Sequence, residues 1–343
     1  MRSLIVSFLT LSIICGIFMG WIALAPNTPQ ISDEKSLYIP QESSFKDVVD
    51  SLKSQNLLDR MWSFRVLAHA TGWDQQIKAG HYVFSAPQSN LQLLQTLRKG
   101  LQTTVVLRIP EGSRRNRVAD VAATNMAFER EDFLAALRDT SLAASLDTDT
   151  LHLFSYMLPE TYHFYWLTDA RDVVARIKRE FDAFYERELS THANARNMTP
   201  LEVLSLAAIV EWETNLDSEK NTIAGVYLNR LRKNWPLQAD PTIQFALIEL
   251  EGNARRLFFR DYRIQHPYNT YLYQGLPPGP ITNPSPVTLR ATAAAEDHTY
   301  MFFVASPNGG HTFNTDLRGH HRDAAKWRRY MAERRRQRSS DMP

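Results

Sequence analysis

The sequence predicts an α+β protein with an N-terminal transmembrane helix, a small first unit and a larger mixed α/β domain. Three observations predict this arrangement. The first residues form a long uncharged run, the residues after it alternate between strand and helix patterns, and capped helical patterns dominate the rest. The predicted boundaries are 1–26 for the anchor, 27–104 for the first unit and 105–343 for the larger domain.

Composition narrows the possibilities further. The chain has 343 residues, of which 44% are hydrophobic, so it can bury the cores of about two globular domains. Its one cysteine, Cys15, excludes an internal disulfide framework and a zinc site built on cysteines. The net charge of +2 favours no class of partner, although the last twenty residues are strongly basic.

The run from Leu4 to Ala25 contains no charged residue. As a helix at about 1.5 Å per residue it would extend about 33 Å, the hydrocarbon thickness of a bilayer. A cleavable signal peptide is the alternative, because Ala23–Leu24–Ala25 resembles a cleavage site, but its apolar core is normally about 7–15 residues. We therefore expect an uncleaved anchor. Arg2 before the span and Asp33–Lys35 after it predict that the N-terminus lies inside and the folded part outside.

The predicted first unit has the order strand, helix, helix, strand. Residues 37–40 and 79–84 are typical of strands, a capped helix follows Ser44, and a second helix covers 61–71. This order resembles that of LysM, a small carbohydrate-binding module, and many other small α+β units share it.

The larger domain is expected to begin with a strand at 103–109 and then to be mainly helical. Its predicted helices lie near Val118 and at 130–137, 170–189, 200–214 and 218–234, and a strand follows at 300–305. The basic residues 326–338 read as a solvated helix end, with attraction to anionic lipid as the alternative.

The helix at 200–214 contains the most informative acid, Glu211. Thr199 and Glu202 can form a capping box around Pro200 at the first helical position, so the start of the helix is well defined. At about 100° per residue, Glu211 and Glu213 point to nearly opposite sides of the helix. The two acids therefore cannot form one catalytic pair.

Glu211 shares its face with Ala207 and Ala208, whose small side chains would leave space for a cleft beside it. A carboxyl desolvated at the edge of a cleft stays protonated nearer neutrality, as a general acid requires. The structural alternative is an ion pair between Glu211 and an arginine of the following helix, Arg230 or Arg232.

Four further segments could contact a ligand. Gly275–Pro284 combines rigid prolines with glycines, and Tyr268–Tyr273 offers aromatic faces, with a structural crossover and core packing as the alternatives. Asp240 precedes Pro241 at the start of a helix, where capping is its favoured role. His311 follows a glycine turn and could bind substrate or satisfy a loop.

No cofactor is expected. His311, His320 and His321 lack the helical spacing of a zinc protease motif, so no metal site is predicted. The chain has no P-loop, dinucleotide-binding loop or nucleophile elbow, and nucleotide and acyl-serine chemistry are not predicted either.

Six short motifs occur in a fixed order, namely Ala207–Thr214, Leu228–Leu231, Leu237–Thr242, Tyr268–Tyr271, Gly275–Ile281 and Gly310–Phe313. Together they resemble the membrane-anchored endolytic murein transglycosylases of the YceG-like family, and the similarity covers nearly the whole chain. One segment departs from the family pattern. Phe154–Tyr162 begins without the usual Glu–Gly, so any role of that glutamate is open in this chain.

The resemblance implies a bacterial, single-pass inner-membrane enzyme with its catalytic domain on the periplasmic side. It would cut peptidoglycan glycan strands between N-acetylmuramic acid and N-acetylglucosamine. The family's catalytic glutamate maps to Glu211, and the substrate-binding residues map to Gln238, Asp240, Asn269, Tyr271 and His311. The implied partners are glycan strands, the inner membrane and peptidoglycan synthases, with no nucleic acid and no metal.

A lytic reaction needs only one acid. Glu211 would protonate the leaving oxygen and then accept the proton of the sugar's C6 hydroxyl as that group closes onto C1, which leaves a 1,6-anhydro end. This cleavage is expected to terminate glycan polymerisation. Two alternatives remain open, namely a lysozyme-type hydrolase with Asp240 as the second carboxylate, and a non-enzymatic scaffold that binds the wall.

Overall fold

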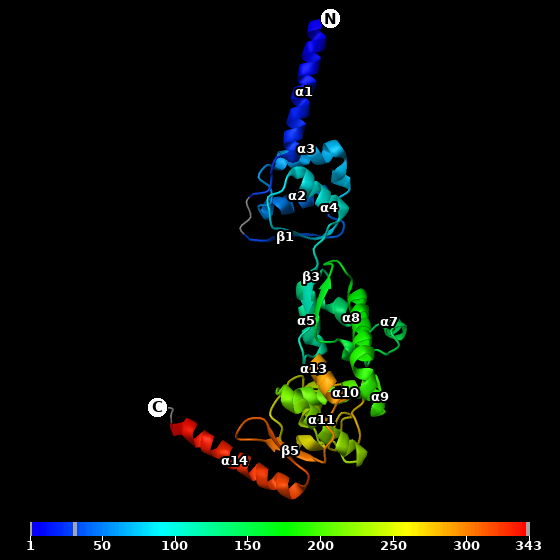
Figure 1. Ribbon diagram of the computed structural model, residues 1–343, viewed down its shortest axis with the longest axis vertical. Coiled ribbons are helices and arrows are strands. Elements are labelled where there is room, and N and C mark those ends of the chain that lie inside the picture. Colours follow the sequence, from blue (N-terminus) through cyan, green and yellow to red (C-terminus); the bar gives the residue numbers. More distant parts are fainter. Residues whose placement is uncertain (1, 30–32, 341–343) are drawn as a thin grey trace. The chain divides into compact units, whose positions relative to one another are not determined.

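The computed structural model describes residues 2–29 and 33–340 of the chain (Figure 1). It divides into two compact units. The first unit contains the described residues up to Leu107. It also includes two segments from the part of the chain that the sequence assigned to the larger domain, Ala122–Arg130 and Thr161–Ala170. The second unit contains the remaining described residues. Both units mix helices with short two-stranded sheets, as the sequence predicts.

The first unit is built on an antiparallel pair of strands. β1 (Lys35–Ile39) pairs with β2 (Gly80–Phe84), and Leu37 lies opposite Tyr82 in the buried centre of the pair. Its helices are α2 (Phe45–Ser54), α3 (Met61–Thr71) and α4 (Asn90–Lys99). The predicted order of strand, helix, helix and strand is therefore present.

Local sequence fixes the ends of these helices. Ser44 and Asp47 form a capping box at the start of α2, and Ser89 and Gln92 form another at the start of α4. α3 ends at Gly72, whose φ of 68° lies in the left-handed region that glycine adopts without strain.

α1 (Arg2–Leu24) is the one helix in the described part of the chain that is long and apolar enough to cross a membrane. Leu4–Leu24 has a mean hydropathy of 2.2, and nearly all of it is exposed. Its last turns differ, because Ile22 is 2% exposed and packs into the core of the first unit. The Ile22 carbonyl also accepts a hydrogen bond from Asn90 Nδ2 at 2.8 Å.

A second pair of strands and a run of helices follow. β3 (Val105–Arg108) pairs with β4 (Thr161–Phe164). The helices of this region are α5 (Arg115–Asn125), α6 (Arg130–Leu137), α7 (Thr140–Ser145), α8 (Ala170–Phe184) and α9 (Ser190–Ala195). The predicted helix at 170–189 is α-helical only as far as Phe184. Tyr185–Leu189 forms a π-helical turn between α8 and α9.

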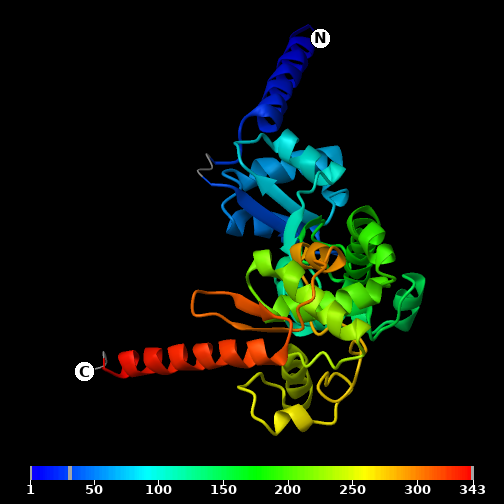
Figure 2. The same cartoon turned by 60° about the horizontal axis from the view of Figure 1, so that its bottom comes forward.

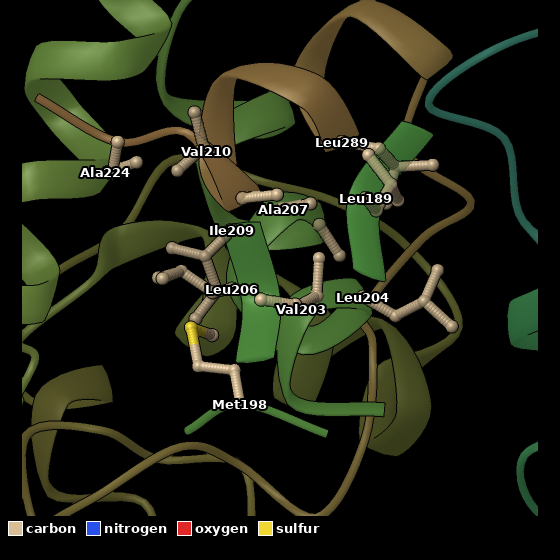
Figure 3. Close-up of a cluster of buried hydrophobic side chains, with 14 of the residues drawn as sticks. Leu189, Met198, Val203, Leu204, Leu206, Ala207, Ile209, Val210, Ala224 and Leu289 are labelled. Carbon is tan, nitrogen blue, oxygen red and sulfur yellow. The ribbon is translucent and has the colours of Figure 1, made fainter. Parts of the chain in front are cut away.

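The second unit is centred on α10 (Pro200–Glu213). Every residue from Val203 to Val210 is buried. Figure 3 shows this core, in which side chains of α10 lie beside Leu189, Ala224 and Leu289 from neighbouring elements. The predicted start of the helix is confirmed, because Thr199 and Glu202 form a capping box before Pro200.

The elements around α10 complete the unit. They are α11 (Asp217–Arg232), α12 (Asp240–Glu251), α13 (Pro286–Ala293), the antiparallel strands β5 (Phe302–Ala305) and β6 (His311–Asn314), and α14 (Leu317–Ser340). Figure 2 shows the β5–β6 hairpin in orange, followed by α14 in red. The predicted strand at 300–305 and helix at 218–234 are thus present with shifted ends.

Candidate active site

Glu213 is the last residue of α10 and has its side chain at a cavity of about 430 Å³. Its carboxylate oxygen Oε1 accepts a hydrogen bond of 2.5 Å from the hydroxyl of Tyr227 on α11. Burial raises the pKa of Glu213 to about 7, the hydrogen bond from Tyr227 lowers it, and the negative charge of Asp240 raises it. Such an acid can donate a proton near neutral pH and accept one back.

The wall of this cavity combines polar and aromatic groups from six segments. They include Arg230 of α11, Gln238 and Asp240 at the start of α12, Tyr271 of the following loop and His320 of α14. Three of the predicted substrate-binding residues, Gln238, Asp240 and Tyr271, therefore line one cavity, and they share it with Glu213.

Asp240 does not have the capping role that the sequence favoured. The residue at the cap of α12 is Ala239, and Asp240 already belongs to the helix and forms no side-chain cap. Its carboxylate instead accepts hydrogen bonds from the hydroxyls of Tyr271, at 2.5 Å, and Tyr262, at 3.5 Å. Burial raises the pKa of Tyr271, and its bond to Asp240 raises it further, so this phenol stays a neutral donor.

Gln238 and Asn269 contribute in different ways. Gln238 is exposed at the cavity and has a φ of 49°, a left-handed backbone conformation that only a few non-glycine residues adopt. Asn269 is fully buried, and its amide donates to the carbonyls of Tyr262 and Ile264, at 3.1 and 2.8 Å. Its oxygen accepts from the backbone N–H of Tyr271 at 2.9 Å. The Asn269 side chain thus holds the loop that carries Tyr271.

Glu211 lies in surroundings of another kind. Its Oε2 accepts hydrogen bonds from Ser285 N at 3.1 Å, from Ser285 Oγ at 2.9 Å and from Thr288 Oγ1. These groups form the N-terminal turn of α13, where the helix dipole also favours a negative charge. Lys220 Nζ lies 3.9 Å from the same oxygen, and both side chains are below 10% exposure.

The two alanines that share the Glu211 face of α10 lie in the core of the second unit. Ala207 and Ala208 are both fully buried in the core, where α13 packs against α10. The space that their small side chains leave is used for close packing of helices. The structural alternative named the wrong partner, because Glu211 has Lys220 within ion-pair distance rather than Arg230 or Arg232.

Arg230 lines the same cavity and is only 7% exposed. Its Nε donates to the carbonyl of Met301 at 2.9 Å, and it also donates to the carbonyl of Leu237. Burial lowers the pKa of Arg230, while the nearby Tyr227 and Glu213 raise it.

His311 does not line this cavity and is paired with an acid of α11. Its Nδ1 lies 2.7 Å from Glu219 Oε2, and its backbone N–H donates to Glu219 Oε1 at 2.7 Å. Its ring also contacts Phe303 edge to face at 5.4 Å. Through Phe303, which lines the cavity, His311 supports the wall from behind.

Comparisons with known proteins show which family the chain belongs to. The YceG-like family model matches residues 37–326. The chain belongs to the YceG-like family.

An endolytic murein transglycosylase of Bacillus subtilis is 26% identical over 332 residues, covering 92% of this chain and 91% of the relative. One of Streptococcus pneumoniae is 26% identical over 303 residues, covering 80% of this chain and 55% of the relative. A 2.6 Å crystal structure of a yceG-like protein from Listeria monocytogenes has a TM-score of 0.58 and 25% identity, covering 85% of this chain and 99% of that chain.

In this YceG-like chain, sequence reasoning missed part of the cavity wall. Tyr227 was not singled out, although it lies on the helix that follows Glu213 and faces it. His320 was considered only as a metal ligand, yet burial lowers its pKa and favours the neutral ring. Its Nδ1 is buried without a hydrogen-bond partner in the described structure. Among residues 2–29 and 33–340, no group of three or more metal-binding side chains occurs.

Proposed function

We propose that this chain is an endolytic murein transglycosylase, a lyase that cuts the glycan strands of peptidoglycan within the strand. The names of its relatives in Bacillus subtilis and Streptococcus pneumoniae support this activity. Membership of the YceG-like family over residues 37–326 supports it as well. The bond cut would join N-acetylmuramic acid to N-acetylglucosamine, and the cut would end the growth of the strand.

The acid of this reaction is Glu213 in our proposal. One observation carries the assignment, namely a carboxyl with a pKa of about 7 at the wall of a 430 Å³ cavity. Glu213 meets both requirements of a general acid, because it reaches a space that can admit a sugar and its pKa of about 7 leaves a large fraction protonated at neutral pH.

The chemistry then needs no second carboxylate. Protonated Glu213 donates its proton to the glycosidic oxygen as the C1–O4 bond breaks. The resulting carboxylate accepts the proton of the C6 hydroxyl while O6 bonds to C1 of the same sugar. The products are a 1,6-anhydro end and a free 4-hydroxyl, and the proton balance of the enzyme is restored.

The predicted binding residues divide into two groups in this proposal. Gln238, Asp240 and Tyr271 line the cavity and offer an amide, a carboxylate and a phenol to the sugar. Asn269 and His311 act through others, because Asn269 holds the Tyr271 loop and His311 supports Phe303.

Glu211, the acid that the sequence favoured, is the second candidate. Ser285 and Thr288 at the start of α13 donate hydrogen bonds to its Oε2, and Lys220 Nζ lies 3.9 Å from the same oxygen. This arrangement suits an anchor between α10 and α13 better than a proton donor, because the described cavity wall does not include it.

Mass analysis of digested glycan strands tests the activity. We expect products that end in 1,6-anhydro sugars, which are lighter by one water than hydrolysed ends. Hydrolysed ends would instead support a lysozyme-type reaction with Asp240 as the second carboxylate. Binding without cleavage would support a wall-binding scaffold, and both outcomes would contradict the lytic reaction.

We infer that the chain works at the bacterial inner membrane with its folded units on the periplasmic side. α1 would be the anchor, and the burial of Ile22 in the core of the first unit supports its retention in the mature protein. The first unit would bind glycan in the manner of LysM, with its order of strands and helices as the supporting observation. Peptidoglycan synthases are the partners that a strand-terminating activity would need.

A further inference from the structure

The segment between α12 and η4 (Asp261–Arg263) exposes aromatic and basic side chains together. Phe259 is 93% exposed and Phe258 is 51% exposed, the former the most exposed large apolar side chain of the described residues. Three arginines around them, Arg256, Arg260 and Arg263, are exposed as well. We call residues 255–263 the Phe259 turn. Figure 2 shows this segment in yellow at the outer edge of the second unit.

The Phe259 turn is held in shape by a buried acid. Asp261 is 2% exposed, and its carboxylate accepts hydrogen bonds from Phe258 N at 2.7 Å and from Arg255 at 2.7 and 3.0 Å. Arg255 also donates to both oxygens of Glu251, at 2.8 and 2.9 Å. These bonds lower the pKa of Asp261 to about 2, so the network persists at any physiological pH. Phe259 therefore projects from a fixed scaffold.

The charge of the turn is positive where it meets solvent. Glu251 and Asp261 are both engaged by Arg255, so the four arginines of the turn exceed these two acids. Arg260 lies 3.8 Å from Asp261 with its side chain 80% exposed. Arg256 and Arg263 form no ion pair with any described residue.

We propose that the Phe259 turn inserts into the headgroup region of an anionic lipid bilayer. An apolar ring at the tip of a rigid turn can enter the interface, while arginines beside it pair with lipid phosphates. Both features are complementary to that surface. This contact goes beyond the proposed function, because it would hold the second unit at the membrane independently of α1.

The test uses the full chain with Cys15→Ser, reconstituted into vesicles of phosphatidylcholine with or without phosphatidylglycerol. A bimane fluorophore is attached at Phe259→Cys and, as a matched control, at Leu151→Cys, a residue of the same unit that is 63% exposed. With nitroxide-labelled lipid and phosphatidylglycerol, we expect at least about twofold stronger quenching at position 259 than at 151. The double variant Arg256→Gln/Arg263→Gln should lower the quenching at 259, and high salt should do the same.

Equal quenching at the two positions, or quenching at 259 that ignores phosphatidylglycerol, would overturn the proposal. A second measurement separates lipid from glycan as the ligand. Phe259→Ser should leave the KM for detergent-dissolved glycan strands unchanged, whereas a raised KM would make the turn a glycan subsite and contradict a lipid contact. The quenching experiment requires no catalytic turnover, so its result does not depend on whether the chain is a lyase.

Discussion

Glu211 and Glu213 are two residues apart on one helix and have opposite surroundings. Glu211 is tied to the first turn of α13 by three donors and has Lys220 nearby. Glu213 receives one donor, Tyr227, and lies near the negative charge of Asp240. The difference teaches that a buried position does not by itself make an acid catalytic. For Glu213, burial raises the pKa to about 7, Asp240 raises it as well, and Tyr227 and Arg230 lower it.

The largest effect on the cleavage rate is expected from replacing the titratable carboxyl of Glu213. Glu213→Gln should lower the rate of glycan cleavage about 10²-fold or more, the usual scale for a lost acid/base group. The amide is neutral at every pH, and Glu213 is most favourable to the fold when protonated. The variant should therefore be at least as stable as the wild type above pH 7. Melting curves and cleavage rates measured together check this, and cleavage at the wild-type rate would remove the assignment.

The matched substitution of Glu211, on the other side of α10, should mainly lower the free energy of unfolding. Glu211→Gln weakens the charge-assisted bonds to Ser285 and Thr288, which should cost about 1–3 kcal/mol. The rate should fall less than about tenfold at a temperature where the variant is folded. A folded Glu211→Gln variant with a rate loss as large as that of Glu213→Gln would reverse the comparison.

Two changes around Glu213 should move the pH profile in opposite directions. The hydrogen bond from Tyr227 lowers the pKa of Glu213, so Tyr227→Phe should raise it and carry the alkaline fall in activity to higher pH. Asp240 raises the same pKa, so Asp240→Asn should lower it and carry the fall to lower pH. Rates measured from pH 5 to 9 check both. Shifts in the same direction, or none, would mean that another group controls the profile.

The smallest effect is expected from His311. His311→Ala removes its contacts with Glu219 and Phe303, and His311 itself does not line the cavity. The loss of about one hydrogen bond corresponds to about 1 kcal/mol, or roughly fivefold in rate. Steady-state cleavage rates check this value, and a loss comparable to that of Glu213→Gln would make His311 a direct participant.

Much of the fold was predictable because local sequence determines it. The capping box of Thr199 and Glu202, the caps of α2 and the alternation of β1 and β2 all depend on residues close in the chain. The opposite directions of Glu211 and Glu213 also follow from helical spacing alone, and the structure gives the two acids different partners.

The environment of each acid could not be predicted in this way. The hydroxyl groups that donate hydrogen bonds to Glu211 lie 74 and 77 residues further along the chain, at the start of α13, and nothing near α10 indicates them. A separation of 31 residues likewise hid the bond between Tyr271 and Asp240, which is present in place of the predicted cap. Small residues beside an acid have two outcomes, a cleft or close helix packing, and only the placement of α13 decides between them.

The most direct test is a titration of the glutamate carboxyls by carbon-13 NMR of the folded chain, compared with the Glu213→Gln variant. We predict one carboxyl that titrates near pH 7 in the wild type and is missing from the variant. A carboxyl that titrates near pH 7 in both proteins, or in neither, would contradict the assignment of the proton donor to Glu213.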